Sequence, residues 1–79
     1  MRLVKSKFIA FNQITDLNQF INNASKVDGE VLLQKDYYIV NGKSILGVMS
    51  IDVSKGVNVV YPADAYEFEQ FIEQFEIVK

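Results

Sequence analysis

Residues 31–61 are the most informative for the fold, and they read VLLQKDYYIVNGKSILGVMSIDVSKGVNVVY. The first half contains two runs rich in β-forming residues, Val31 to Lys35 and Tyr37 to Val40, with a break at Lys35-Asp36. Two such runs separated by a short polar break predict a β-hairpin. Asn41-Gly42 then ends the second strand, because these two residue types adopt turn conformations at low cost.

The second half of this stretch predicts a short helix followed by another strand. Ser44 to Ile51 is largely apolar and begins with serine, which is a preferred helix N-cap. Lys55-Gly56 predicts a turn, and Val57 to Tyr61 is a run of strong β-formers that Pro62 ends.

Toward the N-terminus, Leu3 to Ala10 alternates with a period of two residues, which predicts a half-buried strand. Its two faces carry Val4, Ser6 and Phe8 on one side and Lys5 and Lys7 on the other.

Asp16 to Val27 has helical spacing, with apolar residues at i, i+3, i+4 and i+7. These are Leu17, Phe20, Ile21 and Ala24. We expect Asp16 to be the N-cap, with Gln19 completing a capping box, and Asp28-Gly29 to stop the helix.

A last helix is predicted from an apolar stripe formed by Ala65, Phe68, Phe71, Ile72 and Phe75. We expect its acidic residues to face water. Residues 64–79 carry a net charge of −4 against −2 for the whole chain. An exposed acidic helix face accounts for this excess, and a basic partner that docks there is the alternative.

The element order is therefore strand, helix, strand, strand, helix, strand, helix. This order predicts a single α+β domain over residues 1–79, with a four-stranded sheet covered by helices on one face.

The composition excludes several classes of function. The chain has no His and no Cys, which removes imidazole acid–base chemistry, thiolate nucleophiles and the common transition-metal ligands. We expect no enzymatic activity, no cofactor and no metal. The eight basic residues form no cluster, so we expect no binding of nucleic acid. No apolar run resembles a signal peptide or is long enough to span a membrane, so we expect a cytoplasmic protein.

Three blocks of the central stretch carry a family resemblance: Lys43-Ser44-Ile45, Gly47-Val48-Met49-Ser50 and Lys55-Gly56. Together with Ala24-Ser25-Lys26, and at matching separations, they resemble the HPr family, the small phosphocarriers of the bacterial sugar phosphotransferase system. The resemblance extends from about Val4 to Ala63. It implies an HPr-like open-faced β-sandwich of βαββαβα order, in which three helices lie on one face of an antiparallel four-stranded sheet.

The resemblance breaks where the family carries its phosphate. The family's His-Ala-Arg-Pro motif falls on Gln13, Ile14, Thr15 and Asp16, so Gln13 stands at the phosphohistidine position and Thr15 at the arginine position. An amide is neither nucleophilic nor basic, and Asp16 adds negative charge where phosphate would bind. We therefore expect a protein that cannot carry phosphohistidine, similar in this respect to Crh-like members of the family.

The resemblance also implies roles for Ser44 and its neighbours. The matching serine of the family is phosphorylated by HPr kinase/phosphorylase, and the product binds a LacI-type transcription regulator. Lys43 would lie beside the phosphate, and the family's partner-docking surface corresponds to Lys43, Ile45, Leu46 and Met49. The residues alone leave two alternatives open, which are a purely structural N-cap at Ser44 and a core position for the three apolar residues.

The leading hypothesis is a non-catalytic regulatory or partner-docking protein linked to the phosphotransferase system and to carbon catabolite repression. The alternatives are an ordinary phosphocarrier of that system and an orphan interaction domain without a phosphosite.

Overall fold

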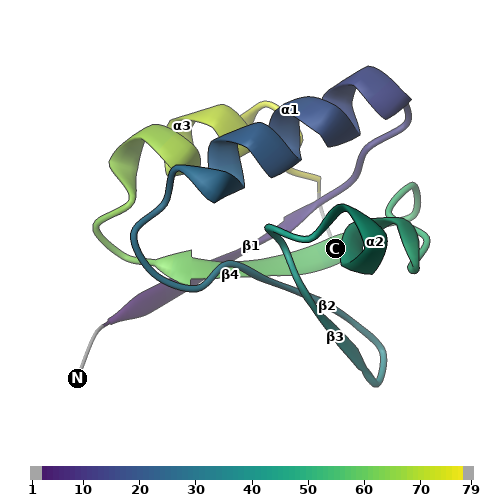
Figure 1. The fold of residues 1–79 in the computed structure, drawn as a ribbon, viewed down its shortest axis with the longest axis horizontal. Coiled ribbons are helices and arrows are strands. Elements are labelled where there is room, and N and C mark those ends of the chain that lie inside the picture. Colours follow the sequence, from purple (N-terminus) through teal and green to yellow (C-terminus); the bar gives the residue numbers. More distant parts are fainter. Residues whose placement is uncertain (1–2, 78–79) are drawn as a thin grey trace.

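The computed structural model describes residues 3–77, and within them the strands and helices follow one another in the predicted order (Figure 1). The elements are β1 (Val4–Ile9), α1 (Ile14–Ser25), β2 (Leu32–Lys35), β3 (Tyr38–Asn41), α2 (Ile45–Met49), β4 (Val57–Pro62) and α3 (Tyr66–Glu73).

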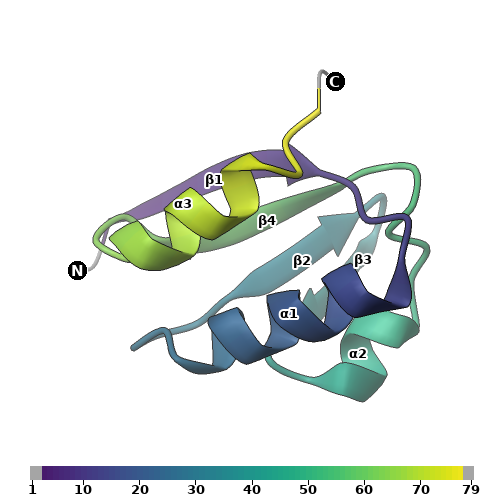
Figure 2. The same ribbon diagram turned by 90° about the horizontal axis from the view of Figure 1, so that it is seen from above.

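The four strands form one antiparallel sheet in the order β1-β4-β2-β3. The last strand in the sequence is therefore a central one. The helices cover one face of this sheet, with α1 and α3 side by side and α2 next to the β2–β3 hairpin (Figures 1 and 2). This is the predicted open-faced α+β sandwich.

The core lies between the sheet and the helices, and alternate residues of β4 form its floor. Val57, Val59 and Tyr61 are at most 1% exposed, because side chains at every second position of a strand point to the same face. Phe20 of α1 and Phe68 of α3 are also buried, with ring centroids 5.6 Å apart. Removing these apolar side chains from water is the main term that holds the helices on the sheet.

In β1, the face that carries the lysines is the one that the helices cover. Lys5 pairs with Tyr61, whose side chain points into the core, and side chains of paired residues lie on the same face. Helix α3 and the segment that follows it supply the compensating charges. Glu69 lies 3.3 Å from the Lys5 ammonium, and Glu76 lies 3.5 Å from that of Lys7. The alternating pattern of β1 alone does not show which of its faces is covered, because that depends on how β1 pairs with β4.

Helix α1 begins earlier than predicted. It starts at Ile14 with Gln13 as the N-cap residue, so the proposed Asp16 N-cap and its capping box with Gln19 are wrong. The reason is that residues 12–15 contain no glycine or proline to prevent the helix from extending. Asp16 instead lies in the first turn, where a carboxylate interacts favourably with the helix dipole.

Other boundaries also differ from the predictions. The first strand is Val4–Ile9 instead of Leu3 to Ala10, β2 begins at Leu32 instead of Val31, and β3 spans Tyr38–Asn41 instead of Tyr37 to Val40. Helix α1 ends at Ser25, although Gly29 does adopt the expected positive φ, at 126°. Helix α2 ends at Met49 rather than Ile51, because the Ser50 hydroxyl donates to the Gly47 carbonyl at 2.6 Å and helps to close the helix. Pro62 is the last residue of β4 instead of the first residue after it.

The expectation that the acidic residues of α3 face water is wrong for Glu69. Its side chain is only 20% exposed and accepts a hydrogen bond of 2.6 Å from the Tyr61 hydroxyl. The physical reason is its place beside the buried stripe, one residue after Phe68 and three before Ile72. The hydrogen bond from Tyr61, with Lys5 adding to it, holds the pKa of Glu69 below its ordinary value. Burial and the same hydrogen bond raise the pKa of Tyr61.

Candidate functional site

Ser44 is the N-cap of α2, as predicted. Its hydroxyl oxygen accepts a hydrogen bond of 3.1 Å from the backbone N–H of Gly47, and its own N–H donates to the Asn41 carbonyl at 3.1 Å. The residue is only partly covered. The hydroxyl therefore stabilises the helix start and also lies near the surface, so both roles considered for it are compatible with this geometry.

Lys43 makes a contact that the sequence did not indicate. Its ammonium donates a hydrogen bond of 2.7 Å to the Val27 carbonyl, just beyond the end of α1, and this bond is partly buried. Its backbone N–H donates to the Asn41 side chain at 2.9 Å. Residues 27 and 43 are 16 positions apart, so local spacing carries no signal of this bond.

The three apolar residues of α2 lie on its outer side. Ile45 is 51% exposed, Leu46 is 80% exposed and Met49 is 58% exposed, whereas Val48 is fully buried. Val48 alone anchors the helix to the core, so the alternative that the other three are core residues is wrong. We call Ile45, Leu46 and Met49 the α2 patch.

The start of α1 carries the other predicted site residues. Gln13 is exposed and its side chain caps nothing, while the Thr15 hydroxyl donates to the Gln13 side-chain oxygen at 3.4 Å. The Gln13 amide is neither nucleophilic nor basic, and the Thr15 hydroxyl bonds to that amide. Ile14 is 66% exposed, and a helix start predicted at Asp16 left this residue outside the helix.

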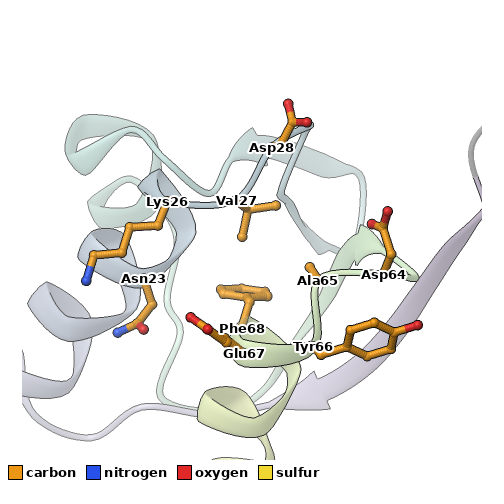
Figure 3. A pocket seen from close by; sticks show the side chains of 9 residues that line it. All are labelled: Asn23, Lys26, Val27, Asp28, Asp64, Ala65, Tyr66, Glu67 and Phe68. Carbon is orange, nitrogen blue, oxygen red and sulfur yellow. The ribbon is translucent and has the colours of Figure 1, made fainter.

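A hollow of about 410 Å³ lies where the end of α1 meets the start of α3 (Figure 3). The Val27 side chain points toward the ring of Phe68, and Lys26, Asp28 and Glu67 also line the hollow. Its lining mixes apolar and charged groups of both signs. Among residues 3–77, no group of side chains is suited to hold a metal ion, and no helix is long and apolar enough to cross a bilayer.

Comparison with known proteins agrees with the geometry. Residues 17–78 match the family model PTS-HPr, described as the PTS HPr component phosphorylation site. The match begins after Gln13 and Thr15, so it does not include the start of α1. The chain is also 36% identical over 55 residues to the HPr-like protein Crh of Bacillus subtilis (strain 168), over 70% of this chain and 65% of that relative. The matched part thus spans slightly less than two thirds of the relative's length.

Two solved structures have a similar fold. The phosphocarrier protein HPr from Bacillus anthracis str. Ames superposes with a TM-score of 0.70 at 23% identity, over 94% of this chain and 96% of that one. HPr-C-His from Thermoanaerobacter tengcongensis gives a TM-score of 0.69 at 27% identity, over 91% and 88% of the two chains. The likeness to the first structure concerns the fold alone.

Proposed function

Because the chain belongs to the PTS-HPr family, we propose that it is a non-catalytic docking protein of the sugar phosphotransferase system, switched by phosphorylation of Ser44. The observation that supports this most is the combination on α2 of a partly exposed serine with the α2 patch directly after it. Flexible Leu, Ile and Met side chains exposed together suit a surface that packs against other proteins. The proposed partners are HPr kinase/phosphorylase and a LacI-type regulator, both in the cytoplasm.

The modification itself is an ordinary phosphoryl transfer. The Ser44 oxygen forms a bond to the γ-phosphorus of ATP, the bond from that phosphorus to the ADP oxygen breaks, and a base of the kinase takes the hydroxyl proton. The product carries a charge of about −1.5 to −2 at pH 7. This charge would stand immediately before the α2 patch, where it can change which partner surfaces bind.

Carriage of phosphohistidine is excluded by composition, since the chain contains no His. We propose that Gln13 occupies the place of the family's phosphorylated histidine. A carboxamide forms no phosphoramidate comparable to that of a ring nitrogen, and no basic side chain accompanies it in the first turn of α1. The ordinary carrier role is therefore the weaker candidate.

The test is intact-mass measurement after two separate incubations, one with HPr kinase/phosphorylase and ATP, the other with enzyme I and phosphoenolpyruvate. We expect a gain of about 80 Da, one phosphoryl group, only in the first reaction. Ser44→Ala should abolish the gain, and Ser50→Ala, at the other end of the same helix, should retain it. Phosphate taken from phosphoenolpyruvate would contradict the proposal, and no gain in either reaction would favour the orphan interaction domain.

The proposed placement of Gln13 has its own test. Gln13→His combined with Thr15→Arg should acquire phosphate from enzyme I and phosphoenolpyruvate, because it supplies a ring nitrogen and a neutralising cation at the start of α1. Asn12→His with Thr15→Arg is the matched control and should stay unmodified. Equal uptake by the two variants would show that Gln13 is not the corresponding position.

A further inference from the structure

Lys43 connects the proposed phosphosite to a different part of the fold. Its backbone is fixed next to Ser44 by the hydrogen bond to the Asn41 side chain, while its ammonium reaches the Val27 carbonyl at 2.7 Å. The residue that precedes Ser44 therefore also holds the segment that follows α1.

The end of α1 benefits from this cation. The helix has no basic residue in its last turn, and its terminal carbonyls carry partial negative charge. The Lys43 ammonium supplies positive charge there from another part of the chain. Val27 also lines the hollow between α1 and α3, where its side chain points toward Phe68 (Figure 3).

We infer that Lys43 transmits the modification of Ser44 to the end of α1. A phosphate on Ser44 carries a charge of about −1.5 to −2 at pH 7 next to Lys43, so it attracts the ammonium as an ion, which the neutral Val27 carbonyl does not. The ammonium therefore moves from Val27 to the phosphate. The segment after α1 then loses its bond to the Lys43 ammonium, and Val27, which lines the hollow, loses the contact that holds its carbonyl.

This inference rests on the proposed function, but it concerns what the phosphate does and not which enzyme attaches it. The test therefore uses the full chain assembled by chemical ligation with phosphoserine at position 44, so that no kinase is needed. Failure of the kinase assay above would count against the proposed function, whereas the measurements below address Lys43.

Two nuclear magnetic resonance measurements test whether the Lys43 ammonium moves from the Val27 carbonyl to the phosphate. In the wild-type chain, phosphoserine at position 44 should shift the backbone amide signals of residues 27–29. Lys43→Gln should abolish these shifts. It should also raise the second pKa of the phosphate by about half a unit or more, because the cation that favours the dianion is gone. A ³¹P titration measures this pKa. Lys55→Gln, which removes a lysine elsewhere, should change neither measurement.

Lys43→Arg keeps the charge and should retain the amide shifts, which separates loss of charge from loss of folding. Unchanged amide signals at residues 27–29 on phosphorylation of the wild-type chain would overturn the inference. It would also be overturned if folded Lys43→Gln showed the wild-type shifts, or if the phosphate of that variant had the wild-type pKa.

Discussion

At Tyr61 a single hydroxyl group connects the central strand to α3. The residue is 1% exposed and its hydroxyl donates to Glu69 at 2.6 Å. Tyr61→Phe keeps the ring but removes this donor, so we expect the free energy of unfolding to fall by about 1 kcal/mol in urea denaturation. Tyr66→Phe, at a side chain that is 67% exposed, is the control and should leave it nearly unchanged. Equal effects of the two variants would mean that the Tyr61 bond adds no stability.

At Gly56, any side chain would strain the backbone and displace a neighbouring ring. Its φ is +115°, and a Cβ atom there would overlap the ring of Phe8. We expect Gly56→Ala to lower the free energy of unfolding by about 2 kcal/mol or more, from backbone strain and the displaced ring. Adding Phe8→Leu to this variant tests the clash, since the double variant should lose less than the sum of the two single losses. A purely additive result would assign the whole effect to the backbone.

The short helix α2 depends on its N-cap. Five residues are too few for a helix to form by propensity alone, so the bond from Gly47 N–H to Ser44 and the burial of Val48 hold it in place. Ser44→Ala should cost about 1 kcal/mol in the free energy of unfolding, measured by urea denaturation. Ser50→Ala removes a hydroxyl that donates to a carbonyl and should cost less than half as much. A Ser44→Ala variant as stable as wild type would argue that the cap has no structural role.

Local sequence predicted the type and the order of the helices and strands correctly, but it predicted the residues at which they begin and end less well. The stripe of α1 was visible, but its start shifted from Asp16 to Ile14 because nothing in residues 12–15 opposes helix formation. The start of α2 was predicted correctly because a serine cap acts within four residues. Its end was not, since the Ser50 hydroxyl can bond in several ways and only the folded chain selects one.

For the whole molecule, we expect the free energy of unfolding to fall at low pH as carboxylates become protonated. The pKa of Glu69 is lowered, chiefly by the hydrogen bond from Tyr61, and that of Asp52 is lowered, chiefly by the side-chain hydrogen bond from Ser54. A carboxyl group whose pKa is lower in the folded than in the unfolded state stabilises the fold at pH values above its unfolded pKa, which is 4.5 for Glu69 and 3.8 for Asp52. This stabilisation is lost as the pH falls through the pKa of the folded state.

The thermal midpoint, followed by circular dichroism, should therefore be nearly constant from pH 8 to about pH 5 and decrease below about pH 4.5. The chain has no His to titrate in the upper range. Glu69→Gln should make the acidic decrease shallower, whereas Glu67→Gln, at an exposed position of the same helix, should not. A pronounced step between pH 6 and pH 7 would contradict this account.

Local patterns in the chain were enough to establish the α+β class, the order of the seven elements, the serine cap of α2 and the absence of histidine. Each of these follows from composition or from residues within a few positions of one another. The folded arrangement was needed to establish which face of β1 is covered, that Glu69 bonds to Tyr61, and that Lys43 bonds to the Val27 carbonyl just beyond α1. The physical reason is that these contacts join residues from different elements, and their energies depend on where packing of the core places each element relative to the others.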